Sequence, residues 1–99
     1  MITGKQRSYL KSLAQKISPA VYIGKADLTD GIINLIDDHL NANELIKCQI
    51  QEGSDLDPKE TCNRIADELG AEFVQAIGHR FVLYRAARDP QKRSIQLPR

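Results

Sequence analysis

Residues 20–36, AVYIGKADLTDGIINLI, carry the pattern that decides the fold. The short β-branched and aromatic run at 20–23 ends at Gly24 and predicts a strand. Thr29 is the expected N-cap of a following helix, and Asp30 lies where the helix dipole favours a negative charge. Apolar residues then recur between Ile32 and Leu40 and form a broad stripe, which predicts a helix that packs on a sheet.

The segment before this strand also predicts a helix. Thr3 and Gln6 have the spacing of a capping box, and the apolar residues between Tyr9 and Ile17 follow at helical spacing. The helix is expected over about residues 4–16, because Ser18-Pro19 ends it. Four basic residues lie largely off its apolar stripe: Lys5, Arg7, Lys11 and Lys16.

Three further elements are predicted after the central helix. Residues 45–51 alternate between apolar and polar, which predicts a half-buried strand with Lys47 on its polar face. Asp57-Pro58-x-Glu60 is a strong helix start, and Gly70 is the expected left-handed stop. Residues 72–77 and 81–85 predict a hairpin around Gly78-His79-Arg80.

The predicted order is therefore α-β-α-β-α-β-β. Right-handed crossovers make the first three strands mutually parallel, and the hairpin makes the fourth antiparallel. We expect a two-layer α/β domain with a four-stranded mixed sheet over residues 1–85. Residues 86–99 lose apolar periodicity and predict a basic C-terminal tail that is extended or mobile.

Charge is segregated along the 99 residues, although the net charge is only +1. Residues 1–25 carry five basic residues and no acid, residues 26–72 carry twelve acids against three basic residues, and residues 73–99 carry six basic residues and one acid. If the basic ends meet in space, they form the positive patch expected for a phosphate-rich partner. The alternative is that these charges are ordinary solvated surface.

Composition and residue spacing disfavour several function classes. No apolar run is long enough to cross a bilayer and no signal-type stretch opens the chain, so a cytoplasmic protein without a membrane partner is expected. Cys48 and Cys62 lie on predicted apolar faces, and with His39 and His79 they lack zinc-ligand spacing. No nucleophile is paired with a base, so we expect no catalytic residue, metal, cofactor or small-molecule substrate.

Several short motifs occur together in one order. They are Gly24-Lys25 after a strand, Leu28-Thr29 opening a helix, Glu44-Leu45-Ile46-Lys47, Gln75-Ala76-Ile77-Gly78 before Val82-Leu83-Tyr84-Arg85, and Ile95-Gln96-Leu97-Pro98 near the end. Together they resemble the CRM domain, and more closely the small stand-alone bacterial proteins of the YhbY-like family. The resemblance covers nearly the whole chain.

The resemblance implies an RNA-binding module with a fold similar to the C-terminal domain of bacterial initiation factor three. It also implies association with ribosomal RNA or large-subunit precursors during ribosome assembly. The family loop is typically Gly-x-x-Gly, which is analogous to the backbone clamp of KH domains. Asp27 replaces the second glycine here, and a carboxylate at that position would repel phosphate.

The expected RNA contacts are the Gly-Lys loop and the basic residues around it: Gly24, Lys25, Arg80, Lys47, Arg85, Lys5, Arg7 and Lys11. For Lys47 the alternative is a solvated strand residue, and for Arg85 it is a surface ion pair of little energetic value. Tyr22 and Tyr84 could stack on bases, but buried edge aromatics are the commoner arrangement. A second hypothesis is a protein-interaction module in which acids such as Asp37 and Asp38 dock a basic ribosomal protein.

Overall fold

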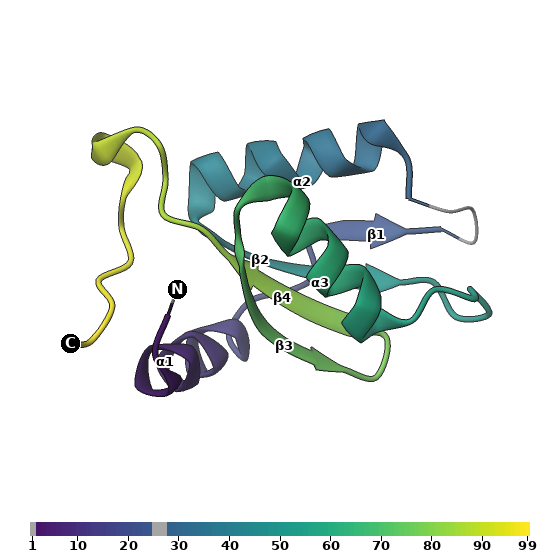
Figure 1. Ribbon diagram of the computed structural model, residues 1–99, viewed down its shortest axis with the longest axis horizontal. Coiled ribbons are helices and arrows are strands. Elements are labelled where there is room, and N and C mark those ends of the chain that lie inside the picture. Colours follow the sequence, from purple (N-terminus) through teal and green to yellow (C-terminus); the bar gives the residue numbers. More distant parts are fainter. Residues whose placement is uncertain (1, 25–27) are drawn as a thin grey trace.

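The computed structural model describes residues 2–24 and 28–99 (Figure 1). The elements are α1 (Gly4–Ala14), β1 (Val21–Ile23), α2 (Asp30–Asn43), β2 (Leu45–Ile50), α3 (Pro58–Leu69), β3 (Glu72–Ile77), β4 (Arg80–Tyr84) and a short 3-10 helix, η1 (Pro90–Lys92). Their order matches the predicted one up to β4. None of the helices described is long and apolar enough to cross a membrane.

Side chains cap each long helix as the sequence predicted. The hydroxyl groups of Thr3 and Thr29 accept hydrogen bonds from the N–H groups of Gln6 and Ile32, at 3.1 and 3.2 Å. The Asp57 carboxylate does the same for the N–H of Glu60 at 3.0 Å, and Gly70 ends α3 at φ +64°. These caps satisfy backbone groups that the helix ends leave unpaired, so they fix where each helix begins or ends.

The four strands form one mixed sheet in the order β1-β2-β4-β3. β1 pairs parallel with β2, and β4 pairs antiparallel with both β2 and β3. β1, β2 and β3 therefore run in the same direction, as predicted, and β4 lies between β2 and β3. The hairpin turn is shorter than expected: Gly78, at φ +59°, and His79 form it, and Arg80 is already the first residue of β4.

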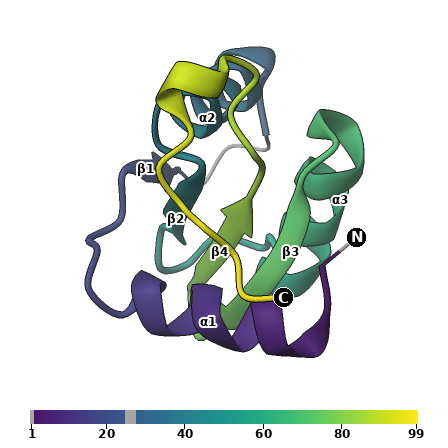
Figure 2. The same ribbon diagram turned by 90° about the vertical axis from the view of Figure 1, so that its left-hand side faces the viewer.

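Helices cover both faces of the sheet, which corrects the expectation of two layers. α2 and α3 pack on one face over a core that includes Ile36, Leu40, Ile65 and Phe81. On the other face Leu10 and Ala14 of α1 belong to a second, smaller core cluster with Leu45, Val74, Val82 and Tyr84. Figure 2 shows α1 below the strands, α2 above them and α3 at the right, beside β3. The alternation over residues 45–51 puts Leu45 on the same, supposedly polar, face as Lys47, but Leu45 is buried under α1.

Residues 86–99 form no helix or strand apart from η1, and they pack against the domain. The carboxylate of Glu44, whose side chain is 1% exposed, accepts hydrogen bonds from the N–H groups of Ala87, Ser94 and Ile95 at 3.0, 2.6 and 3.0 Å. Ile95 and Leu97 then pack on the α1 cluster. Burial of the carboxylate acts to raise the pKa of Glu44, but the three N–H donors and nearby Arg93 outweigh burial, and the net pKa is lowered.

Candidate nucleic-acid interface

One residue from each strand contributes to a row across the sheet on the side of α1. Tyr22 of β1 lies opposite Gln49 of β2, Gln49 lies opposite Arg80 of β4, and Arg80 lies opposite Ile77 of β3. Side chains alternate between the two faces along a strand, so Arg80 shares a face with Val82, two residues on, which packs under α1. We call Tyr22, Gln49, Arg80 and Ile77 the cross-strand row.

The cross-strand row is open because α1 covers only the other half of this face. Tyr22 is 65% exposed and Ile77 is 69% exposed, whereas Val82 and Tyr84, further along β4, are buried. Burial is therefore confirmed for Tyr84, although β4 is an interior strand and not an edge, and it is wrong for Tyr22. β1 is an edge strand, and the described neighbours of Tyr22 on this face leave most of its ring in solvent.

Basic side chains flank the row along the sheet. The Arg80 Nε donates a hydrogen bond to Gln49 Oε1 at 3.1 Å, which holds an exposed guanidinium over the sheet. Lys47, half-buried, lies two residues before Gln49 on the same face of β2. With Lys16, in the turn after α1, Lys47 lines an apolar hollow of about 470 Å³, which His39 also lines.

The cations of α1 reach the other end of the row. Arg7 and Lys11, together with Lys59 of α3, line a hollow of about 530 Å³ that runs along β3 to Ile77. The Arg7 Nε donates to the carbonyl of Phe73 at 3.1 Å, so its position is fixed against β3. The Lys5 Nζ donates to the carbonyl of Arg99 at 3.3 Å, at the N-terminal end of α1.

Acidic side chains gather mainly on the opposite side of the sheet. α1 holds no acid, and the cross-strand row holds none. α2 and α3 together carry six acids and cover the other face: Asp30, Asp37, Asp38, Glu60, Asp67 and Glu68. α1 and the exposed Arg80 side chain thus lie on the face of the sheet opposite the acidic helices, as the charge pattern requires. Two basic residues of α3, Lys59 and Arg64, are the exceptions on those two helices.

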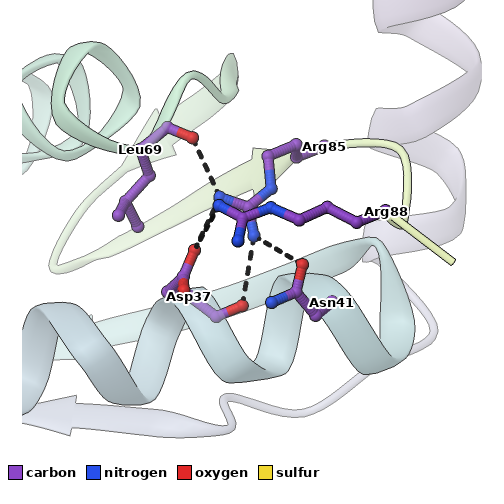
Figure 3. Close-up of polar contacts among 5 residues, drawn as sticks. All are labelled: Asp37, Asn41, Leu69, Arg85 and Arg88. Atoms are coloured by element: carbon purple, nitrogen blue, oxygen red, sulfur yellow. Dashed lines mark hydrogen bonds and ion pairs between the residues drawn. The ribbon is translucent and has the colours of Figure 1, made fainter.

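Arg85 is a predicted RNA contact, but it lies away from this side of the sheet and its side chain is held by contacts within the protein. Its side chain is 10% exposed and forms an ion pair with Asp37 at 2.7 Å (Figure 3). It also donates to the carbonyls of Leu69 and Asp37 and to the side chain of Asn41, at 2.9, 3.2 and 2.9 Å. Arg85 therefore fastens the end of β4 to α2 and α3, and it is neither available to RNA nor a surface ion pair. Asp37 is likewise engaged, which weakens the hypothesis of a docking surface around it.

The basic residues of the tail also lie elsewhere. The tail crosses the C-terminal end of α2, where Arg88 approaches Asp37 at 3.6 Å. The Arg93 Nε donates to the carbonyl of Ala87 at 2.7 Å. Lys92 is exposed on η1. The basic residues of 73–99 were expected to join those of residues 1–25 in one patch. Arg80 lies on the α1 side of the sheet as expected, whereas Arg88, Lys92 and Arg93 do not.

The predicted Gly-Lys loop is described only at Gly24, because Lys25 and Asp27 lie outside the described residues. Gly24 follows β1 directly and is half-buried. A Cβ atom there would be 3.6 Å from Gln51 Oε1, an ordinary contact, and Gly24 is not among the glycines with positive φ. Among the described residues, therefore, neither the backbone conformation of Gly24 nor a neighbouring atom requires glycine at position 24.

Cys48 and Cys62 are free and buried, as predicted. Burial raises the pKa of each thiol to about 12, so neither is a thiolate nucleophile near neutral pH. In the part of the chain that the structure describes, no three His, Cys, Asp or Glu residues gather where they could hold a metal ion. His39 is half-buried and lines the apolar hollow beside Lys16 and Lys47.

Comparison with known proteins identifies a family and several relatives that are named RNA-binding proteins. The model of the CRS1 / YhbY (CRM) domain matches residues 2–85. An RNA-binding protein of Haemophilus influenzae is 40% identical over 99% of this chain and 96% of its own length. The Bacillus subtilis protein YqeI, named a probable RNA-binding protein, is 32% identical over 99% of this chain and 100% of its own length. A Staphylococcus aureus protein, proposed to bind RNA, has a solution structure that matches with a TM-score of 0.81 at 39% identity, covering 99% of this chain and 100% of that one.

Proposed function

Because the chain belongs to the CRS1 / YhbY (CRM) domain family, we propose that it binds RNA through the α1 side of its sheet. The observation that carries the proposal is the separation of charge across the sheet. Lys11 and Arg7 of α1, Lys47 of β2 and Arg80 of β4 lie on one side, and the acids of α2 and α3 lie on the other. Such a one-sided positive field attracts a polyanion and orients it toward that side.

The proposed phosphate path runs from α1 to the end of β1. It follows the hollow lined by Arg7, Lys11 and Lys59, passes Arg80 at the cross-strand row and ends at Gly24. Lys25, which lies outside the described residues, stays a proposed contact from the sequence alone. Among the described residues, a Cβ atom at position 24 would meet only an ordinary contact with Gln51, and we attribute the glycine to close approach of the RNA backbone to the main chain. Lys5 lies beside Arg99, and it adds to the positive charge at the N-terminal end of α1.

We further propose that the RNA is ribosomal, as mature RNA or as a large-subunit precursor, and that the protein acts during ribosome assembly without a catalytic step. This assignment comes from the family resemblance. Crosslinking in cells followed by sequencing of the attached RNA tests it. We expect the reads to gather on large-subunit ribosomal RNA, and a spread over messenger RNA or transfer RNA would contradict it.

The electrostatic mechanism is tested by measuring affinity for a ribosomal RNA fragment at rising salt. A protein that neutralises about four phosphates loses about a hundredfold in affinity over a fourfold rise in salt. We expect Arg80→Glu to weaken binding about tenfold and to flatten the salt dependence. Lys92→Glu makes the same charge change on the exposed η1 and is the matched control, expected to stay within about twofold.

Two outcomes would contradict the assignment of this face. The first is a salt-independent affinity of the wild-type protein. The second is an equal loss for Arg80→Glu and Lys92→Glu, because this would mean that only net charge matters. Circular dichroism of both variants checks that the fold is intact.

A further inference from the structure

We propose that the cross-strand row is a platform for one or two unpaired RNA bases, so that the protein selects RNA whose phosphate backbone lies beside an unstacked nucleotide. The inference rests on the proposed function and goes beyond it, because phosphate contacts alone do not distinguish paired from unpaired RNA.

Tyr22 supplies the first element of the platform. Its neighbours Val21 and Ile23 are buried on the other face, so the strand is anchored while the Tyr22 ring stays 65% exposed. A strand has few degrees of freedom, and the ring is therefore presented to solvent on a rigid support. An aromatic ring on an open sheet face is a surface on which a base of any sequence can stack.

Arg80 and Gln49 supply the second element. The Gln49 side chain accepts the Arg80 Nε–H at 3.1 Å and so restrains the guanidinium group, whose remaining N–H donors stay available. A restrained guanidinium can stack on a base or donate to its edge, and it can also contact the adjoining phosphate. Ile77, at the β3 end of the row, adds an exposed apolar surface beside it.

Charge identifies the occupant as a nucleic acid. The four row residues and α1 contain no acid, and the hollow lined by Arg7, Lys11 and Lys59 opens at Ile77. A ligand that fits must combine flat apolar groups over Tyr22 and Ile77 with negative charges over the flanking cations. An unpaired nucleotide within an RNA strand has both, whereas a duplex hides its base faces in the stack.

The test compares a ten-nucleotide single-stranded RNA with the same backbone carrying abasic sites. Removing bases keeps the phosphates, so it isolates stacking. We expect the wild-type protein to bind the complete strand about tenfold more tightly than the abasic strand. Tyr22→Leu should abolish this preference while leaving the abasic affinity and its salt dependence unchanged, and Tyr22→Phe should keep it. Tyr9→Ala, an exposed aromatic of α1 outside the row, is the matched control.

A direct readout is available because the chain contains no tryptophan. Tyr22→Trp places a single indole in the row, and stacking should quench its fluorescence with the complete strand but not with the abasic strand. Equal binding of the two strands by the wild-type protein, with normal salt dependence, would overturn this inference and leave the proposed function standing. Failure to bind any RNA would overturn both. A change in sedimentation of the RNA-free Tyr22→Leu protein, without a change in RNA binding, would make the row a self-association surface and overturn the inference.

Discussion

On one face of the sheet, α2 and α3 pack over side chains from all four strands, including Val21, Cys48, Phe81 and Phe73. On the other face, α1 covers a smaller cluster, and the cross-strand row is left in solvent. The two faces share one backbone, and the residues on them alternate along each strand. The face under α2 and α3, which we call the closed face, therefore stabilises the domain. The exposed part of the other face, which we call the open face, carries side chains on which folding does not depend.

The largest expected effect tests the closed face. Phe81 of β4 is fully buried under α2 and α3, so Phe81→Ala removes a large side chain from the main core. We expect the free energy of unfolding to fall by about 3–5 kcal/mol, measured by urea denaturation followed by circular dichroism. Ile77→Ala, next to it in the hairpin but on the open face, should cost less than about 1 kcal/mol. Similar losses for the two variants would contradict the distinction between the faces.

The next effect concerns two arginines near Asp37. Arg85→Ala removes the group that joins β4 to α2 and α3 and leaves the carbonyls of Leu69 and Asp37 without their donor. We expect a loss of about 2–3 kcal/mol in the free energy of unfolding. Arg88, whose side chain is 71% exposed, is the control, and Arg88→Ala should change stability by less than about 0.5 kcal/mol. If the two variants were equally stable, Arg85 would not hold the closed face together.

A smaller effect is expected where the tail docks. The folded-state pKa of Glu44 is lowered, so its carboxylate contributes stability above about pH 4.5 that is lost as the pH falls through the folded-state value. Glu44→Gln should cost about 1–2 kcal/mol at neutral pH and remove that part of the acid dependence. Amide hydrogen exchange of Ser94 and Ile95 should accelerate in this variant. Glu52→Gln, in an exposed loop, should retain both the wild-type exchange and the wild-type acid profile, and an unchanged Glu44→Gln profile would contradict the role of the carboxylate.

The smallest effect on stability is expected at the open row. Tyr22→Ala should change the free energy of unfolding by less than about 0.5 kcal/mol, because its ring is mostly in solvent in the folded and unfolded states alike. The same urea titration measures it. A loss of several kcal/mol would mean that Tyr22 serves the fold after all.

Local signals in the sequence predicted most of the fold. Thr3, Thr29 and Asp57 cap helices through groups three residues away, and such short-range contacts are visible in the spacing of residues. The parallel direction of β1, β2 and β3 followed from chain connectivity. The second helical layer was missed, although Leu45 on the supposedly polar face of β2 was a signal for it.

Long-range contacts explain what could not be predicted. The Glu44 carboxylate binds the N–H groups of Ser94 and Ile95, which lie about fifty residues away, and Arg85 meets Asn41 more than forty residues back. No local spacing encodes such pairs. In the candidate site, the predicted Arg80 and Lys47 lie on the same face. Tyr22 was considered for base stacking from the sequence, but its exposure and its place in one row with Gln49 and Arg80 required the strand order and register.

The two ends of the described chain lie side by side (Figure 2). The N–H of Ile2 donates to the Glu72 carboxylate, and the Gln6 side chain donates to the carbonyl of Pro98, at 2.8 and 3.0 Å. A domain whose ends meet can be inserted into a surface loop of a host protein at small entropic cost, because the host loop closes over a short gap. In Figure 1 the C-terminus lies at the far left of the molecule, and the turn between β3 and β4 lies at its right. A host protein attached at the two ends would leave the cross-strand row accessible, because Ile77 and Arg80 of the row flank that turn. The fold is therefore suited to insertion into other proteins.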